Sequence, residues 1–249
     1  MDKVTFEVCA GSYQDCLAAW KGGADRVELN SALSVGGLTP SLVSLMRVKR
    51  ELTLPVICMV RPRAGGFCYD RTETELMLEE AELLLGHGAD GIAFGFLNAD
   101  RTIERKKTEA MAELIHKRGG EAVFHRAFDV TPDPEQAIEI LIECGADRIL
   151  TSGQKAKAPD GAELIQRLQE KYGAQVEILA GSGINETNVK KLIAETGIRQ
   201  VHSSCKAWQM DPTTFSEEVS YAYLPKPHEA EYDYVDAERV KKLRTQIYE

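Results

Sequence analysis

Short apolar runs alternate with longer segments of helical period along the chain as far as about residue 204. Each run has the length of a buried strand, and each intervening segment repeats its apolar residues with the spacing of a helix. Repeated strand and helix units imply parallel strands joined by right-handed crossovers. The pattern predicts eight strands, at residues 4–9, 26–29, 55–60, 91–94, 122–125, 148–150, 177–180 and 200–202.

Eight such units predict an α/β fold, a single (β/α)₈ TIM barrel. The 249 residues match the usual length of one barrel, so the chain needs no second domain. An open, doubly wound sheet is the alternative, but no GxGxxG motif follows the first strand, which favours closure. We expect one domain over residues 1–249, with the barrel at about 1–204 and a C-terminal helical extension at about 205–249.

Short sequence motifs predict where several helices begin and end. Three copies of a Gly-Ala-Asp sequence lie between a predicted helix and the next strand, where glycine suits a left-handed helix C-cap. Such loops lie at the N-terminal face of a barrel, so we assign them to stability. Capping residues are predicted to start helices at Thr39-Pro40, Asp133-Pro134 and Asn185-Glu186.

The extension begins with residues 211–232, which are rich in Pro, Tyr and acidic residues and show no strand alternation. Asp236 is predicted to cap a final amphipathic helix that ends near Tyr248. The extension either covers the outside of the barrel or, through Trp208 and the tyrosines, forms a lid or a dimer contact.

The composition and the net charge indicate which kinds of binding partner are unfavourable. With 43% hydrophobic and 28% charged residues the chain is an ordinary globular protein, and its net charge of −9 disfavours binding to nucleic acid or an anionic membrane. The N-terminus has no signal-peptide pattern and no apolar run reaches roughly 18 residues, so we expect a cytoplasmic protein. The six scattered cysteines contain no CxxC pair, which predicts neither disulfides nor a structural zinc site.

Strand alternation turns polar side chains into the upper barrel. Because helix-facing positions are apolar, Val27 and Leu29 face outward, and Glu28 and Asn30 therefore face inward. Charged groups in a closed apolar barrel are unfavourable unless they are paired or solvated, so these residues form either an ion-pair network or a ligand site. Their number at strand ends favours a site. The same alternation turns inward Glu7, Cys9, Met59, Arg61, His125 and His202.

Residues at the strand ends suit the binding of a small anionic or phosphorylated molecule. Arginine binds carboxylate or phosphate with two parallel hydrogen bonds, and the Gly-Ser-Gly loop after the seventh strand leads toward a helix N-terminus, a pattern typical of phosphate sites in barrels. No lysine ends a strand and only Lys155 comes near, which argues against a Schiff-base aldolase. The predicted substrate-binding residues are Asn30, Arg61, Arg63, Arg126, Ser152, Gly181, Ser182, Gly183, His202 and Ser203.

Four residues are candidates for proton transfer. His125 can act as a general acid or base near neutral pH, with Glu7 or Glu28 as a second proton carrier. A structural histidine is an equally good interpretation of His125. Asp129 completes the candidate catalytic set, one helical turn beyond His125.

A metal site is the other option for the barrel mouth. Cys9 and Met59 both face inward, and thiolate and thioether are soft ligands that select Cu(I). His125 or His202 can complete such a site. Met59 is also an ordinary core residue, so Cys9 is the candidate metal ligand.

Several motifs, in order and at matching spacing, resemble the CutC copper-homeostasis family. The similarity runs from about Phe6 to Trp208 and is weaker beyond. It implies a TIM barrel, a cytoplasmic homodimer and copper binding. The motifs are EVCAGSYQDCL, GGADRVELN, GGLTPS, RPRAGGFCYD, HRAFD, RILTSGQ, AGSGI and VHSS followed by AW.

Two positions depart from the family pattern. Asn30 stands where the common version has a cysteine at the end of the second strand, and Gly66 replaces an aspartate in the loop after the third. One soft ligand is therefore missing from any copper site built around Cys9. Two functions remain open: a CutC-like protein that binds Cu(I), and a barrel enzyme of lyase or isomerase type with a small anionic substrate.

Overall fold

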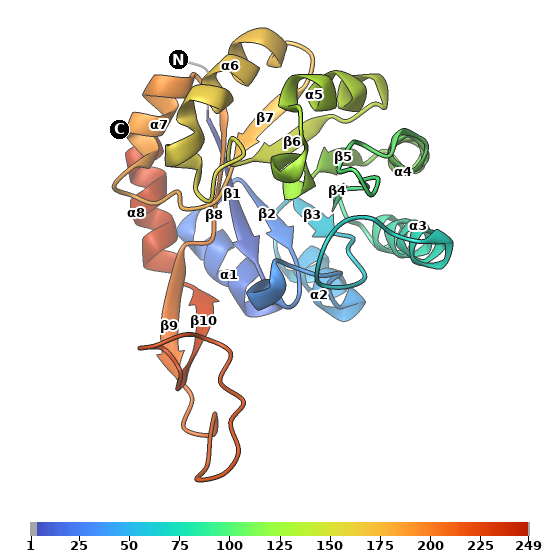
Figure 1. Cartoon of the computed structure of the whole chain (residues 1–249). Helices are drawn as coiled ribbons and strands as arrows, with labels where there is room; N and C mark the ends of the chain where they lie inside the picture. The colour runs from blue at the N-terminus through green and yellow to red at the C-terminus, as the bar shows by residue number, and fades with distance from the viewer. Residues whose placement is uncertain (1–3, 249) are drawn as a thin grey trace.

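The computed structural model describes residues 4–248, and within them eight parallel strands close into one barrel (Figure 1). Each strand pairs with the next in sequence, and β8 returns to pair with β1. The predicted (β/α)₈ barrel is confirmed. The strands are β1 (Thr5–Ala10), β2 (Arg26–Leu29), β3 (Val56–Met59), β4 (Gly91–Phe94), β5 (Glu121–Phe124), β6 (Arg148–Thr151), β7 (Glu177–Ala180) and β8 (Gln200–Ser203).

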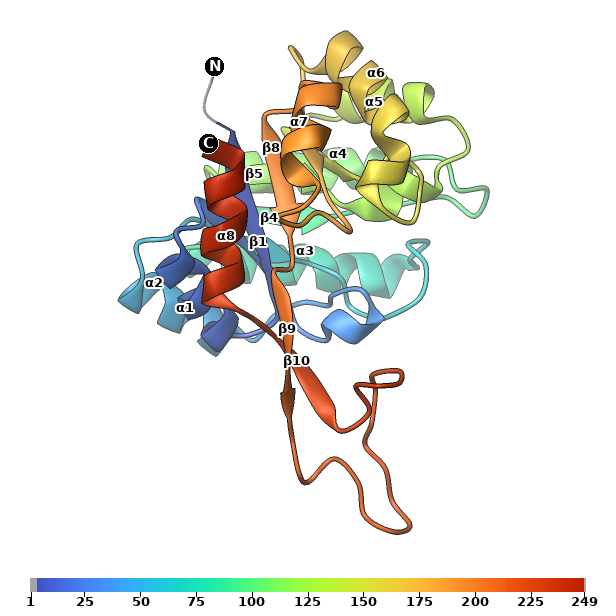
Figure 2. The same cartoon turned by 90° about the vertical axis from the view of Figure 1, so that its left-hand side faces the viewer.

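Helices surround the barrel and cover its outer surface in both views (Figures 1 and 2). They are α1 (Tyr13–Gly22), α2 (Leu42–Glu51), α3 (Arg71–Gly86), α4 (Arg105–Lys117), α5 (Pro134–Glu143), α6 (Ala162–Tyr172), α7 (Val189–Thr196) and α8 (Ala237–Tyr248). Three short 3₁₀ helices lie in the connections: η1 (Leu33–Val35), η2 (Arg126–Val130) and η3 (Ala158–Gly161).

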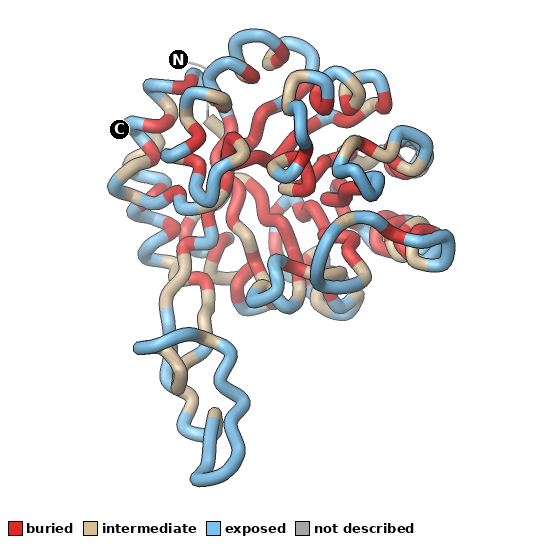
Figure 3. The backbone as a smooth tube through the Cα atoms, in the orientation of Figure 1, coloured by how far each residue is buried: buried red, intermediate tan, exposed pale blue. Residues whose placement is uncertain are grey.

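The strands are buried on both faces, as parallel strands inside a ring of helices must be (Figure 3). The main apolar core lies between strands and helices and contains the outward-facing Val27 and Leu29. A second, small apolar cluster of Ile57, Met59, Ala93 and Val123 occupies alternate strand positions, on the inner face. Buried polar residues, among them Glu7, Glu28 and His202, take inner positions on β1, β2 and β8.

The three Gly-Ala-Asp loops have one structural role, as predicted. Their glycines adopt positive φ angles of 83°, 95° and 84°, at Gly23, Gly88 and Gly145. The aspartates accept hydrogen bonds of 2.7–2.9 Å from the backbone N–H of a neighbouring strand, at Phe6 for Asp25, Val56 for Asp90 and Ala122 for Asp147. These bonds join each helix-to-strand turn to the start of an adjacent strand, at the face opposite the site.

The helix-start predictions have mixed outcomes. Asp133 caps α5 by accepting from the N–H groups of Glu135 and Gln136, with Pro134 as the first helical residue, as expected. The prediction at Thr39-Pro40 is wrong, because α2 begins at Leu42. Instead of capping a helix, the Thr39 hydroxyl accepts a hydrogen bond from the Arg61 N–H.

The prediction at Asn185 is also wrong, since α7 begins only at Val189. Asn185 closes a separate turn in which its side-chain oxygen accepts from the N–H of Thr187. Asn188 bridges this turn by accepting from the Asn185 N–H and donating to the Gly183 carbonyl. The helix N-terminus therefore lies one turn of chain beyond the Gly-Ser-Gly loop.

The extension contains a hairpin that the sequence did not predict. β9 (Lys206–Met210) and β10 (Glu231–Val235) pair antiparallel, and the chain then enters α8, which Asp236 caps as expected. α8 packs on α1 and α7 and so covers the outside of the barrel beside the closure of the sheet (Figure 2). The approach is close, because a Cβ on Gly22 would lie 2.4 Å from the Val240 side chain.

Asp15 links the extension to the barrel through hydrogen bonds. Its carboxylate is buried and accepts from the Val235 N–H at 2.8 Å and from the Gly11 N–H at 3.0 Å. We expect Asp15→Ala to lower the free energy of unfolding by about 3 kcal/mol, because it leaves these N–H groups without a partner. Asp15→Asn keeps one acceptor oxygen and should lose less. Urea unfolding and amide exchange at Val235 test this, and unchanged exchange at Val235 in the alanine variant would contradict it.

Candidate functional site

A cavity of about 330 Å³ opens at the C-terminal ends of the strands. Side chains from both halves of the barrel line it, and it lies at the face of the barrel that carries the active site in enzymes of this fold. Its walls are formed by Cys9, Glu28, Asn30, Leu33, Gly36, Met59, Arg61, Phe67, His125, Arg126, Leu150, Ser182, Gly183, His202, Ser203, Ser204 and Lys206.

A buried ion pair lies at the seam between β8 and β1. Glu7 accepts from His202 Nδ1 at 2.7 Å through one oxygen and from Arg26 Nε through the other. Arg26 also donates to the Gln200 side chain at 2.8 Å. Burial raises the pKa of Glu7, but the charge of Arg26 and the contact with His202 outweigh it and lower the pKa to about 2. Glu7 is therefore ionised at every physiological pH.

His202 carries the matching positive charge. Burial lowers its pKa, but hydrogen bonds to Cys9 and Glu7 together with the charge of Glu28 hold the pKa well above the ordinary 6.5. The imidazole is thus protonated at neutral pH, with Nδ1–H directed to Glu7. This leaves Nε2 as the nitrogen available to the cavity.

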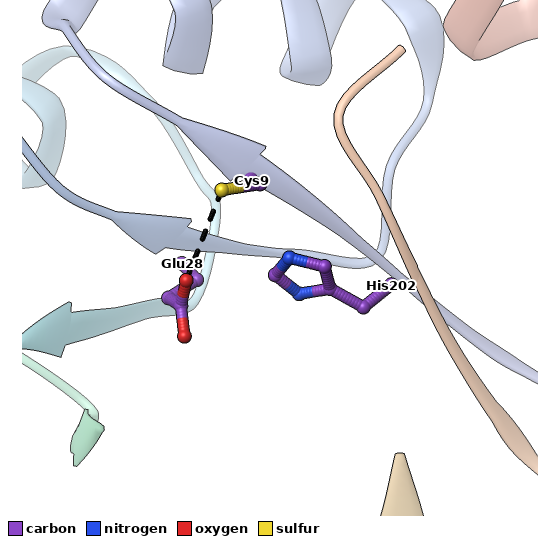
Figure 4. Close-up of side chains that lie close together, drawn as sticks. All are labelled: Cys9, Glu28 and His202. Atoms are coloured by element: carbon purple, nitrogen blue, oxygen red, sulfur yellow. Dashed lines mark hydrogen bonds between the residues drawn. The ribbon is translucent and has the colours of Figure 1, made fainter. Parts of the chain in front are cut away.

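Cys9, Glu28 and His202 form a compact donor group (Figure 4). One potential ligand atom from each residue lies within 4.8 Å of the others. The Cys9 thiol donates to Glu28 Oε2 at 3.8 Å, and Asn30 Nδ2 donates to the same oxygen at 3.0 Å. Burial raises the pKa of both Cys9 and Glu28, so the thiol keeps its proton in the absence of a ligand.

His125 lies on the opposite wall and is neutral. Burial and the nearby charge of Arg61 lower its pKa to about 3. Its Nδ1 accepts from the Ala127 N–H at 3.1 Å, which places the ring proton on Nε2. Nε2 is buried without a hydrogen-bond partner, and Phe67 packs on the ring at a centroid distance of 4.9 Å. His125 is therefore a fixed donor, and its neutral form cannot accept a proton at Nε2.

Arg61 holds the loops that surround the mouth. One terminal nitrogen donates to the carbonyls of Val35 and Gly37, and the other donates to the carbonyl of Gly65. Its Nε is buried without a partner, as is Asn30 Oδ1. Both residues line the cavity, so two of its wall residues have a buried polar atom without a hydrogen-bond partner.

Some predicted residues lie outside the cavity. Arg63 is directed to the surface, where it pairs with Glu73. Asp129 accepts from Arg126, from the Thr151 hydroxyl and from the N–H groups of the following loop, so its carboxylate is fully used in holding that loop. Ser152 is buried in the same network.

The Gly181–Gly183 loop is only partly at the site. Ser182 and Gly183 line the cavity, whereas Gly181 packs against Leu150 and its N–H donates to the Thr151 carbonyl. The Ser182 hydroxyl donates to the Ala156 carbonyl, and that of Ser203 to the Ile184 carbonyl. Because α7 starts further along the chain, the expected helix N-terminus does not directly follow this loop.

The sequence prediction missed several residues of the site. Arg26 and Gln200 precede Glu28 and His202 by two positions, so strand alternation turns them inward as well and could have identified them. Phe67 and Lys206 reach the cavity from loops or from the hairpin, and no periodic pattern indicates this.

The chain is similar to known proteins over most of its length. The model of the CutC family matches residues 4–207. The chain belongs to the CutC family. A CutC family protein of Treponema denticola is 47% identical over 86% of both chains. A human copper homeostasis protein cutC homolog is 38% identical over 81% of this chain and 73% of its own.

The structure of the copper homeostasis protein CutC from Streptococcus agalactiae superposes with a TM-score of 0.76 at 30% identity. It covers 81% of this chain and 98% of its own. Asn30, at the position where the resemblance leads us to expect a cysteine, has its Nδ2 3.7 Å from the Cys9 sulfur. A cysteine at this position would therefore stand beside Cys9.

The Glu7 ion pair predicts how stability depends on pH. The carboxyl pKa is 4.5 when unperturbed and about 2 in the folded protein, so its contribution is complete above 4.5 and is lost as the pH falls through about 2. The shift corresponds to about 3 kcal/mol. We expect Glu7→Gln to be less stable than the wild type at pH above 4.5 and to show a weaker decline in acid. Urea unfolding across this range, with exposed Glu75→Gln as control, measures the difference.

Proposed function

We propose that this CutC protein handles copper by binding Cu(I) at the mouth of the barrel, through Cys9 and His202. The observation that carries the proposal is the grouping of Cys9, Glu28 and His202 within 4.8 Å. Within residues 4–248 no other group of three such side chains meets this description. The names of the human and streptococcal relatives, which refer to copper homeostasis, support the same conclusion.

The donor set fits a soft monovalent ion. Thiolate and imidazole are ligands that Cu(I) accepts, and the Met59 thioether lies in the wall of the same cavity. Glu7 on Nδ1 of His202 supplies the outer carboxylate that commonly orients a metal-binding histidine. Glu28 is a harder ligand, and we assign it the role of accepting the proton of the Cys9 thiol.

Binding must displace protons. Cys9 and His202 both have raised pKa values, and each must lose a proton before it can coordinate a metal. The affinity for Cu(I) should therefore increase with pH through the neutral range. Protonated His202 would instead favour an anion, whose affinity should decrease as the pH rises. The direction of the pH dependence therefore distinguishes a metal from an anion.

Removal of the thiol tests the site. Cys9→Ser should weaken Cu(I) binding by more than the roughly 10–100-fold expected for loss of an outer partner, which Glu7→Gln models. Cys68→Ser removes an exposed thiol outside the cavity and should bind like the wild type. Competition against a Cu(I) chelator under reducing conditions gives the affinities. Equal affinity of the Cys9 and Cys68 variants would exclude this site.

A second candidate function is an enzyme of lyase or isomerase type acting on a small anionic substrate. The specific observation is that His125 and Arg61, which line the same cavity, each have a buried N–H without a partner, at Nε2 and at Nε respectively. Two buried donors without acceptors are suited to a carboxylate, carbonyl or phosphate oxygen. Because Phe67 packs on the His125 ring, binding would include displacement of this side chain.

Two matched substitutions distinguish the roles of the two ring nitrogens of His125. Asn can preserve the acceptor for the Ala127 N–H while removing the donor at Nε2, and Gln can preserve the distal donor while removing the Nδ1 acceptor. We expect stabilisation of the wild type by inorganic phosphate or pyruvate to disappear in His125→Asn and to persist in part in His125→Gln. Thermal unfolding with each anion measures this. No stabilisation of the wild type by either probe would count against the enzyme.

Within residues 4–248 no helix is long and apolar enough to cross a membrane. We propose that the protein acts in the cytoplasm, on copper or a small anion and without nucleic acid, in line with its net charge of −9.

A further inference from the structure

The start of the hairpin adds a cation to the mouth of the barrel. Lys206, the first residue of β9, lines the cavity together with Ser203 and Ser204. The pairing of β9 with β10 sets its position, so it belongs to the extension and not to the barrel strands. Its ammonium group pairs with Asp233 at 2.6 Å, and its side chain remains 36% exposed. Because an ammonium group has three N–H donors, this ion pair leaves two of them for a ligand.

Backbone N–H groups without a backbone partner lie in the same part of the cavity wall. Ser182, Gly183 and Ser204 line the cavity, and within the described residues 4–248 their N–H groups form no backbone hydrogen bond. Ser182 and Gly183 adopt successive positive φ angles, of 78° and 72°. Successive N–H groups in a bend of this kind can form a concave site for an anion. The ends of β7 and β8 therefore offer several donors close to Lys206.

A second set of donors lies across the mouth. Arg61 follows β3, which is four strands from β7 in the closed barrel of eight, so the two sides of the cavity face each other. Arg61 Nε and His125 Nε2 are both buried without a partner. His125 is only 3% exposed, and its other ring nitrogen is occupied by the Ala127 N–H. The cavity thus has hydrogen-bond donors at two opposite ends.

The charges of the cavity wall differ from those of the whole chain. The wall contains three basic side chains, Arg61, Arg126 and Lys206, and one carboxylate, Glu28. Arg126 and Lys206 are paired with carboxylates that do not line the cavity. The whole chain has a net charge of −9, so this excess of basic groups is local. A cleft lined by one sign of charge concentrates ligands of the opposite sign.

We propose that Lys206 and the N–H groups of Gly183 and Ser204 bind a phosphate group, and that the same ligand presents a carboxylate or carbonyl to His125 and Arg61. A phosphate group has three strong acceptor oxygens, which suits several donors, whereas two donors suit a carboxylate or carbonyl. The ligand class is therefore a small phosphate monoester of a carboxylic or keto compound. This inference rests on the second candidate function, the enzyme with a small anionic substrate.

The size of the cavity agrees with this class of ligand. Its 330 Å³ lies at the lower end of the range of roughly 300–1,000 Å³ for ligand pockets. A molecule of a few carbon atoms with an anionic group at each end fits such a volume. Lys206 would then select phosphorylated ligands over unphosphorylated ones, although it lies outside the barrel strands.

Calorimetric titration of the full chain with four compounds tests the proposal. 2-Phosphoglycolate and 3-phosphoglycerate carry both a phosphate and a carboxylate, whereas inorganic phosphate and pyruvate each supply one end only. We expect the tighter-binding of the two phosphorylated acids to exceed both single-ended compounds in affinity by at least about tenfold, because one molecule then occupies both ends. Phosphorylated acids that bind no more tightly than inorganic phosphate would overturn the proposal.

Two substitutions that break the same ion pair isolate the role of Lys206. Lys206→Gln should weaken binding of the phosphorylated acid on the order of 10- to 100-fold and leave pyruvate binding unchanged. Asp233→Asn keeps the cation and should bind the phosphorylated acid at least as tightly as the wild type. Lys191→Gln removes an exposed lysine of α7 and serves as the charge control. Equal losses in the Lys206 and Asp233 variants would indicate a structural role for the ion pair and contradict the proposal.

The failure of this inference and the failure of the enzyme candidate give different results. If pyruvate binds but neither phosphorylated acid binds more tightly, the phosphate end is wrong and the enzyme candidate stands. If the wild type binds none of the four compounds, both are wrong. Neither result bears on the binding of copper at Cys9.

Discussion

The buried carboxylate of Glu7 is the constraint on which the rest of the barrel mouth depends. Glu7 is the register partner of Arg26 on β2 and of His202 on β8, so one side chain joins the first, second and last strands. A shift of register by one residue would turn His202 toward the helices and leave two charges unpaired in the interior. The ion pair therefore fixes where the sheet closes and, with it, the position of Cys9 and Glu28 one step higher on β1 and β2.

The same charges set the chemistry of the cavity. Hydrogen bonds to Cys9 and Glu7 keep the pKa of His202 high, and burial raises the pKa of the Cys9 thiol, so the ligand-free site holds protons that a metal must displace. An anion would instead be attracted by the imidazolium and by the donors of Arg61 and His125. The two ligand classes thus require opposite protonation states of one residue, and the pH dependence of binding is the property that separates them.

The barrel and the inward residues could be predicted because both follow from periodicity. Strand alternation is a local property with a period of two, and it turned Glu28, Arg61, His125 and His202 into the cavity. It also turned Glu7 inward, where the carboxylate lies below the cavity and pairs with Arg26 and His202. Capping signals succeeded at Asp133 and Asp236. They failed at Thr39 and Asn185, because Thr39 binds a group distant in sequence and Asn185 closes a separate turn. Asp129 and Arg63 have the expected residue types, but which partner each selects depends on tertiary packing that no local pattern contains.

The hairpin of β9 and β10 could be predicted neither from the family resemblance nor from the periodicity of the sequence. The match to the family model ends at residue 207, within β9, so the similarity describes the barrel and says little about the projecting hairpin. Yet the two parts share a residue: Lys206 begins β9, pairs with Asp233 of β10 at 2.6 Å and also lines the cavity. The first strand of the hairpin therefore supplies one residue of the cavity wall, at a position that no strand alternation in the barrel indicates.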